Sequence, residues 1–181
     1  MLRILFVCTG NTCRSPMAKA IFEAKSREYG INSAFSSAAL GFCEGQPVSK
    51  NAVIVCNEIG LDISDHKPRI IRQRDIDITD IFVVMTVSHA ETLLSEGVPR
   101  EKIYILGGGV PDPYGSDLIT YRRCRRFIEE SIDTFCRILK QKISKGEIKV
   151  NDDLRVNDDL KVNDDIQVND NDSTDVGENG K

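Results

Sequence analysis

The stretch that decides the fold is LRILFVCTGNTCRSP, residues 2–16 of the chain. It opens with an apolar run, interrupted only by Arg3, of the length that is typical of a buried β-strand. Pro16 suits the first position of a helix, and Ser15 suits the capping position before it. The stretch therefore predicts a strand that ends at Cys8, a tight loop, and a helix that follows at once.

Segments of these two kinds alternate along the first 149 residues. Further strands are expected at 33–37, 81–85 and 103–106, and helices at 16–25, 49–59, 89–94 and 116–142. Strands separated by helices favour a parallel sheet that is covered on both faces. The predicted fold is α/β: a single three-layer domain with a four-stranded parallel sheet, helices on both faces, and the loop after its first strand as the binding loop.

The composition of the chain changes at about residue 150, which separates an expected domain, 1–149, from an expected tail, 150–181. The tail holds 10 acidic and 3 basic side chains and the domain 18 and 21, so the net charge of −4 averages an acidic segment with a slightly basic one. From Val150 the tail repeats a six-residue unit that begins VNDDLR, a period that maintains no apolar face on a helix. It has no aromatic residue and is expected to be disordered. An acidic arm for a basic partner or for cations is the functional alternative, and a short stack of hexapeptide coils is a weaker one.

Cysteine usage and hydrophobicity bear on the compartment. Six cysteines, at positions 8, 13, 43, 56, 124 and 136, form no CxxC pair, which is typical of reduced thiols in an intracellular protein. No apolar run approaches the roughly 18 residues of a membrane span, and the N-terminal apolar stretch is too short for a secretory signal. The sequence predicts a cytoplasmic protein with no membrane partner, and it carries no signal for an oligomeric state.

The loop of residues 8–15 combines the features of an anion-binding site. Backbone N–H groups of a tight loop at a helix N-terminus form a cradle for anions, and ligands gather beyond the carboxyl ends of parallel strands. Gly10 and Asn11 tolerate the positive φ angles that such a cradle requires. Arg14 offers a planar fork that fits two phosphate oxygens. The loop is therefore predicted to bind a phosphoryl group.

Cys8 and Asp112 are the candidate catalytic groups. Cys8 ends the strand at the floor of the cradle, where the helix end and Arg14 favour its thiolate form, and a thiolate beneath a phosphoryl group is positioned for in-line attack. Phosphoryl transfer also needs an acid for the leaving group, and the turn DPYG, residues 112–115, follows the fourth expected strand. The residues alone leave two alternatives open: a buried cysteine under an ordinary turn, and an Asp-Pro turn with no catalytic part.

Residues 7–18, VCTGNTCRSPMA, resemble the signature of the low-molecular-weight protein tyrosine phosphatase family. The segment DPY, residues 112–114, is similar to that family's second motif, and short segments between the two motifs resemble its connecting segments. The resemblance covers about residues 1–145. It implies a protein phosphatase that acts on phosphorylated proteins and needs no metal or other cofactor.

The resemblance also implies a role for each residue of the two motifs. Cys8 would form a phosphocysteine intermediate, and Asp112 would protonate the leaving group and then activate water. Arg14 and the amides of residues 9–14 would bind the phosphoryl oxygens, Asn11 would hold the loop, and Ser15 would donate to the thiolate. The residues implied in substrate and phosphate binding are Thr9, Gly10, Asn11, Thr12, Cys13, Ser15 and Tyr114.

Thr12 bears on the choice of substrate. The run CTGNTCR, residues 8–14, resembles the protein-arginine-phosphatase branch of the family, whereas tyrosine-directed members often carry a bulkier apolar residue in place of Thr12. A threonine hydroxyl can meet the polar edge of a guanidinium, to which an isoleucine would offer only methyls. Phosphoarginine is the expected substrate and phosphotyrosine the alternative. Two weaker alternatives are an arsenate reductase, although residues 57–123 lack the two further cysteines it needs, and a non-catalytic phosphate-binding module.

Several other residues carry weaker signals. A reversible Cys8–Cys13 disulfide would protect the nucleophile from over-oxidation, and a Cys13 that simply packs behind the loop is the equal alternative. The remaining cysteines are expected in the core or at the surface, and the two histidines, His66 and His89, show no metal-ligand spacing. The basic run at 122–126 is expected to be a solvated helix face rather than a nucleic-acid site.

Overall fold

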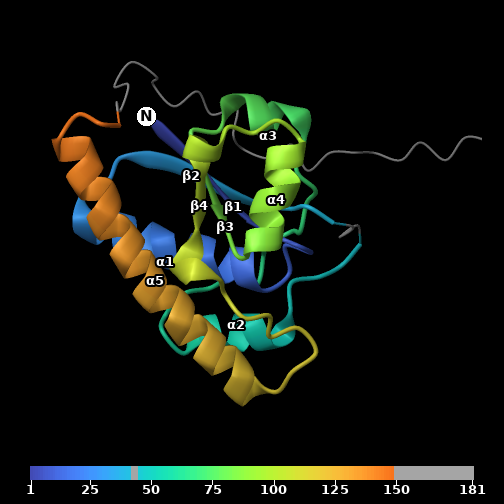
Figure 1. The fold of residues 1–181 in the computed structure, drawn as a ribbon. Coiled ribbons are helices and arrows are strands. Elements are labelled where there is room, and N and C mark those ends of the chain that lie inside the picture. Colours follow the sequence, from blue (N-terminus) through green and yellow to red (C-terminus); the bar gives the residue numbers. More distant parts are fainter. Residues whose placement is uncertain (42–44, 149–181) are drawn as a thin grey trace, which may run out of the picture.

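A four-stranded parallel sheet forms the centre of the computed structural model, which describes residues 1–41 and 45–148. The strands lie in the order β2-β1-β3-β4 (Figure 1). Their bounds are Leu2–Cys8 for β1, Ser33–Ala39 for β2, Ile81–Val84 for β3 and Ile103–Ile105 for β4. All three pairings are parallel, which confirms the sheet that the sequence predicts. The central strand, β1, leads directly into the loop that is expected to bind phosphate.

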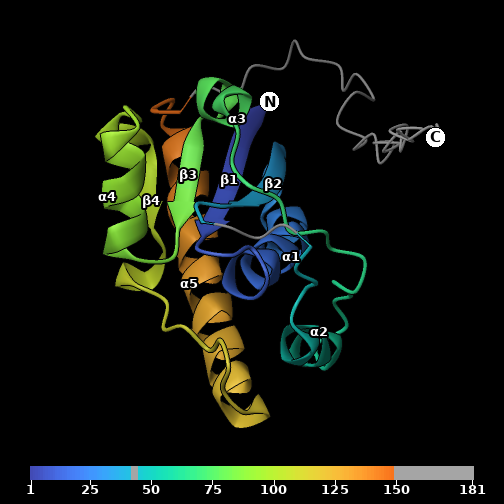
Figure 2. The same cartoon turned by 90° about the vertical axis from the view of Figure 1, so that its right-hand side faces the viewer.

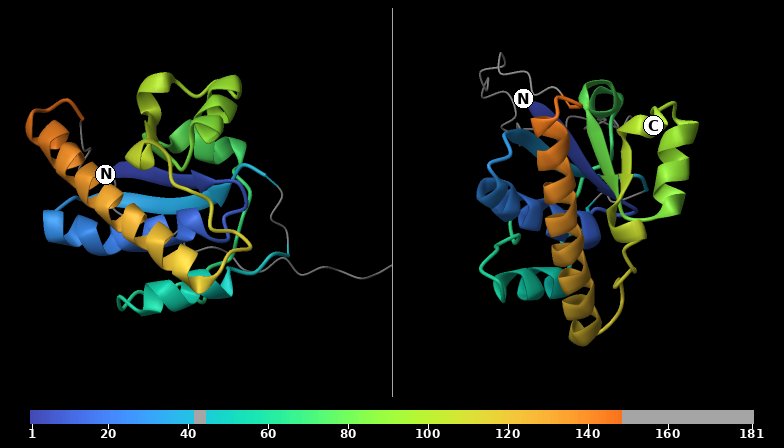
Figure 3. Two further views of the ribbon diagram at one scale, coloured as in Figure 1. Left: turned by 60° about the horizontal axis from the view of Figure 1, so that its bottom comes forward. Right: turned by 60° about the vertical axis from the view of Figure 1, so that its left-hand side comes forward.

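Helices cover both faces of this sheet (Figures 2 and 3). On one face α1 packs along α5, and α2 packs against α5 beyond the carboxyl ends of the strands; α3 and α4 lie on the other face. The bounds are Arg14–Tyr29 for α1, Lys50–Asn57 for α2, Gln73–Ile78 for α3, Val87–Ser95 for α4 and Leu118–Ser144 for α5. Short 3-10 turns, Arg100–Lys102 and Leu106–Gly108, flank β4. The predicted three-layer α/β arrangement is confirmed.

Side chains of β1 alternate between two hydrophobic cores. Ile4 and Phe6 join the larger core under α1 and α5, whereas Leu5 and Val7 join the smaller one under α4. All four are at most 2% exposed. Because both faces of β1 are buried, its sequence is a nearly continuous apolar run instead of an alternating one. This double burial fixes Cys8 at the carboxyl edge of the sheet, where it belongs to the larger core.

The first helix begins two residues earlier than its sequence predicts. Cys13 occupies the capping position and Arg14 is the first helical residue, so Pro16 stands at the third position. A proline is tolerated there because the N–H groups of the first turn have no acceptor within the helix. The prediction that Ser15 caps this helix is therefore wrong, and its hydroxyl is free to serve the neighbouring thiol.

Two other elements differ from the prediction, and one prediction is untested. The sequence did not predict the helix α3. This helix has no buried residue, so its sequence shows no apolar periodicity. The last helix begins at Leu118, where the Asp117 side chain accepts a hydrogen bond from the N–H of Thr120. The expected acidic tail, with the domain boundary before it, and Cys43 lie outside the described residues. Within the described part of the chain, no helix is long and apolar enough to cross a membrane.

Candidate active site

The loop between β1 and α1 lines a pocket at the carboxyl edge of the sheet. The rest of the pocket wall comes from residues that follow β2 and from the segment between β4 and α5. Its lining residues are Cys8, Thr9, Gly10, Thr12, Cys13, Arg14, Gln46, Asp112 and Tyr114. Eight of the ten predicted site residues thus meet in one pocket. The other two, Asn11 and Ser15, are fully buried and do not line it.

Cys8 is a buried thiol that faces hydrogen-bond donors. Its Sγ atom lies 3.3 Å from the backbone nitrogen of Asn11 and 3.0 Å from the Ser15 hydroxyl. The Asn11 side-chain amide donates to the same hydroxyl at 2.8 Å. Since that amide occupies an acceptor site on the Ser15 oxygen, the hydroxyl proton of Ser15 can point to the sulfur. A thiolate at Cys8 would therefore accept two hydrogen bonds.

Asn11 holds the shape of the loop. Its φ angle is +53°, a left-handed conformation found at no other non-glycine residue among those described. Its side-chain oxygen accepts from the backbone N–H of Arg69 at 3.2 Å, and Nε2 of His66 lies 3.1 Å from this oxygen and 3.0 Å from the Asn11 carbonyl. Burial lowers the pKa of His66 to about 4, so its ring is neutral at pH 7 and donates from Nε2.

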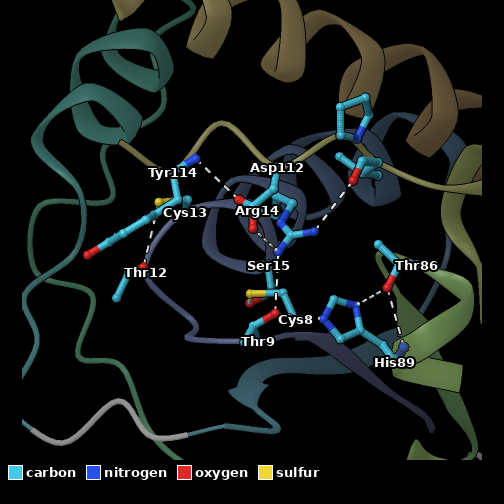
Figure 4. Close-up of polar contacts among 12 residues, drawn as sticks. Cys8, Thr9, Thr12, Cys13, Arg14, Ser15, Thr86, His89, Asp112 and Tyr114 are labelled. Atoms are coloured by element: carbon cyan, nitrogen blue, oxygen red, sulfur yellow. Dashed lines mark hydrogen bonds and ion pairs between the residues drawn. The ribbon is translucent and has the colours of Figure 1, made fainter. Parts of the chain in front are cut away.

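Arg14 and Asp112 form an ion pair in the pocket (Figure 4). Nη2 of Arg14 lies 2.6 Å from a carboxylate oxygen of Asp112, and the other carboxylate oxygen accepts from the backbone N–H of Tyr114 at 3.2 Å. The Arg14 side chain is 6% exposed, and that of Asp112 is 51% exposed. The predicted acid therefore stands at the mouth of the pocket, and the predicted phosphate ligand is anchored within it.

The back of the loop is fastened to α2 and α5. The backbone N–H of Ser49, just before α2, donates to the carbonyl of Thr12 at 2.9 Å, and the Ser49 hydroxyl donates to the hydroxyl of Tyr121 at 2.9 Å. Sγ of Cys13 lies 3.1 Å from the same tyrosine oxygen. Cys8 and Cys13 are both free, buried thiols in this structure, and both line the pocket.

Other predicted features fall away from the pocket. Cys56, Cys124 and Cys136 are buried, and burial raises the pKa of each to about 12, so they are inert core thiols, as the sequence predicts for Cys124. The basic run at 122–126 is not uniformly solvated. Arg125 is 7% exposed and pairs with Glu129, and Arg122 forms a bidentate ion pair with Glu58.

Sequence reasoning passed over the residues that support the loop from outside it. His66, His89, Ser49 and Tyr121 each bond to a loop residue, and Gln46 lines the pocket. A usable signal existed for His89, because it stands in the first turn of the helix that follows the buried strand at 81–84. The partners of such a residue lie at the same edge of the sheet as the loop.

A strand, an anion-binding loop and a buried thiol under a helix N-terminus are the parts that a cysteine-based phosphatase requires. Residues 3–145 match the family model described as low molecular weight phosphotyrosine protein phosphatase, and the chain belongs to this family. Its relatives include protein-arginine-phosphatases and protein-tyrosine-phosphatases, and this chain is a low-molecular-weight protein phosphatase.

Three comparisons illustrate the range of the family. The chain is 34% identical over 147 residues to the protein-arginine-phosphatase of Geobacillus stearothermophilus, which covers 76% of this chain and 96% of that protein. It is 31% identical over 134 residues to the arsenate reductase of Bacillus cereus, covering 74% and 93%. The fold matches a Cys-to-Ser mutant of YwlE arginine phosphatase with a phosphorylated active-site serine, at a TM-score of 0.73 and 29% identity, covering 77% and 97%.

Proposed function

We propose that this enzyme removes the phosphoryl group from phosphoarginine side chains of proteins, with Cys8 as nucleophile, Arg14 as phosphoryl ligand and Asp112 as acid and base. One observation carries the proposal: Sγ of Cys8 lies under the loop within reach of two donors, with Arg14 and Asp112 in the same pocket. The free thiols among the described cysteines also agree with the reducing conditions of the cytoplasm, where we expect the enzyme to act.

The first step transfers the phosphoryl group to the enzyme. Loop amides and the Arg14 guanidinium bind the phosphoryl oxygens, and the Cys8 thiolate attacks phosphorus in line with the leaving nitrogen. The S–P bond forms as the P–N bond breaks, and Asp112 gives its proton to the departing guanidine nitrogen. A phosphoryl oxygen that binds Nη2 of Arg14 competes with the Asp112 carboxylate for this nitrogen, and so leaves the carboxyl group available to the leaving group.

The second step returns the enzyme to its starting state. The Asp112 carboxylate takes a proton from water as the water oxygen attacks phosphorus. The O–P bond forms, the S–P bond breaks, and inorganic phosphate leaves the pocket. Cys8 is released as a thiolate, which the Ser15 hydroxyl and the Asn11 N–H stabilise as the leaving group of this step.

Thr12 is the residue that we propose to favour arginine. It lines the pocket beside Cys8, and its hydroxyl lies near the thiol of Cys13 at 3.6 Å, a weak contact that leaves it able to bond a substrate. A guanidinium brings N–H groups that lose their water partners on entering the pocket, so a hydroxyl acceptor there lowers the desolvation penalty. The phenyl ring of phosphotyrosine has no such groups at the corresponding place.

The test is a kinetic comparison of one peptide carrying phosphoarginine with the same peptide carrying phosphotyrosine. We expect the natural enzyme to have the higher kcat/KM for phosphoarginine. Thr12→Ile should shift the ratio of the two kcat/KM values toward phosphotyrosine by about tenfold, the effect of one lost hydrogen bond. Thr12→Ser, which keeps the hydroxyl, is the matched control and should preserve the ratio. An unchanged ratio in Thr12→Ile would remove the reason for assigning arginine.

The arsenate reductase alternative lacks support in the chain itself. Such an enzyme must pass electrons from the first cysteine through further cysteines, and residues 57–123 contain none. The next one along the chain, Cys124, is a buried core thiol.

A further inference from the structure

His89 connects α4 to the phosphate-binding loop from the opposite face of the sheet. His89 is 7% exposed, and both its ring nitrogens have partners. Nδ1 lies 2.9 Å from the hydroxyl of Thr86, the capping residue of α4, and Nε2 lies 2.9 Å from the hydroxyl of Thr9 (Figure 4). The imidazole is therefore held at one end by its own helix and bonds at the other end to the residue that follows Cys8.

Thr9 continues this chain of contacts to the guanidinium of Arg14. Nη2 of Arg14 donates to the Thr9 hydroxyl at 3.5 Å, and Nη1 donates to the carbonyl of Val110 at 3.5 Å. Asp112 is the third partner of the guanidinium, and the proposed reaction requires its carboxyl group at the leaving group. When the Asp112 carboxyl group turns to the leaving group, two of the three partners, Thr9 and Val110, remain to orient Arg14.

The state of the His89 ring suits this position. Burial and the nearby Arg14 lower the pKa of His89 to about 4, and the carboxylate of Asp112 only partly opposes them. A neutral imidazole has one donor and one acceptor nitrogen, so it can donate to one threonine hydroxyl and accept from the other. An imidazolium would donate at both ends and would place a second cation beside Arg14.

We propose that His89 is a positioning residue for phosphoryl transfer: by holding the Thr9 hydroxyl it orients the Arg14 guanidinium toward the phosphoryl oxygens. His89 does not line the pocket and touches no reacting atom, so it acts through Thr9. The proposal rests on the role of Arg14 as phosphoryl ligand. His89 is thus more than a buried residue in the first turn of α4.

The first test is a double-mutant cycle between Thr9→Val and His89→Leu, read out by the affinity for inorganic phosphate, which requires no turnover. Each single variant should weaken phosphate binding and lower kcat/KM by about tenfold, as expected for one lost buried hydrogen bond. The double variant should bind phosphate about as well as the single variant with the lower affinity, because both changes break the same contact. Thr92→Val, which removes an exposed hydroxyl on the same helix, is the matched control and should match the natural enzyme.

Two outcomes of the cycle would overturn the proposal: losses that simply add in the double variant, or single variants that bind phosphate normally. His89→Gln, whose amide can replace one polar end of the ring, should recover part of the loss and guards against a variant that merely unfolds. If phosphate affinity follows the cycle but Cys8→Ser still turns over substrate, the proposed function fails and the positioning role stands.

Ring-nitrogen NMR checks the contact between Thr9 and His89 directly, without phosphate binding or turnover. The chain has two histidines, so a histidine-labelled sample yields two ring systems, and His66 serves as an internal reference. We expect both rings to be neutral at pH 7, and Thr9→Val should shift the Nε2 signal of His89 while that of His66 stays in place. A doubly protonated His89 at pH 7, or a His89 signal that ignores Thr9→Val, contradicts the proposal.

Discussion

At the scale of single residues, the site is a buried thiol that faces two hydrogen-bond donors. Ser15 illustrates how the local structure serves this end. Because the helix is capped at Cys13 and already includes Ser15, the serine hydroxyl is released from capping and lies 3.0 Å from Sγ of Cys8. The side chain of Asn11 then orients this hydroxyl by donating to its oxygen. The side chains of Asn11 and Ser15 thus bear on both the conformation of the loop and the reactivity of the Cys8 sulfur.

The Asp112→Asn variant tests the proposed acid. An asparagine keeps the size of the side chain but cannot give a proton to a leaving nitrogen, so kcat for phosphoarginine peptides should fall by about 100-fold or more. An activated aryl phosphate, whose phenolate leaves without a proton, should lose far less. Steady-state kinetics on both substrates make the comparison. Equal losses on the two would argue against the acid role.

Residues of the site differ in how well the sequence predicts them. Cys8, Arg14 and the loop between them are contiguous and have a recognisable chemistry, and Asp112 follows a predicted strand. His66, His89 and Tyr121 meet the loop across 55, 80 and 108 residues of chain. Only the fold brings such pairs together, so patterns within a short window do not indicate them, except that the position of His89 just after a buried strand places it at the edge of the sheet where the loop lies.

At the scale of elements, burial decides what the sequence reveals. β1 and β3 are buried on both faces and appear as apolar runs, which makes them easy to predict. α3 has no buried residue, and polar contacts stabilise it: Asp75 accepts from the backbone N–H of Arg72 at 2.8 Å and forms a bidentate ion pair with Arg69. Such a helix lacks the periodicity on which prediction depends.

The start of α1 shows a second limit at this scale. Proline fits any position of the first turn, since none of those N–H groups has an acceptor in the helix, so Pro16 marks the turn without fixing its first residue. The two-residue difference brings Arg14 into the helix, where it is 5% exposed and its guanidinium reaches Asp112. An error of two residues in the predicted start of a helix therefore changes which side chains are predicted to be anchored.

At the scale of the whole molecule, the proposed catalytic residues Cys8, Arg14 and Asp112 all lie within residues 3–145, the part of the chain that matches the family model. The acidic repeat that begins at Val150 makes the net charge negative, whereas residues 1–149 have more basic than acidic side chains. A net positive charge on the catalytic part suits anionic phosphorylated substrates.

Truncation tests the proposed boundary between domain and tail. A chain that ends at Lys149 should keep kcat/KM within about twofold of the full chain, because the proposed site residues all lie within the part that matches the family model. Its thermal unfolding midpoint should also stay close to that of the full chain. Kinetics and melting curves of the two chains, measured side by side, make the check. A tenfold loss of activity would show that residues 150–181 take part in the function of the enzyme.

Hydrolysis by Cys8→Ser tests the central claim most directly. A serine hydroxyl in place of the thiolate should lower turnover of phosphoarginine and phosphotyrosine peptides by at least about a thousandfold, as is typical when a nucleophile is removed. Binding of inorganic phosphate should persist, because the loop amides and Arg14 remain in place. Phosphate release, compared with that of the natural enzyme at equal concentration, is the measurement. Loss of turnover with retained phosphate binding is the predicted result, and residual hydrolysis of more than a few per cent would contradict the role of Cys8 as the nucleophile.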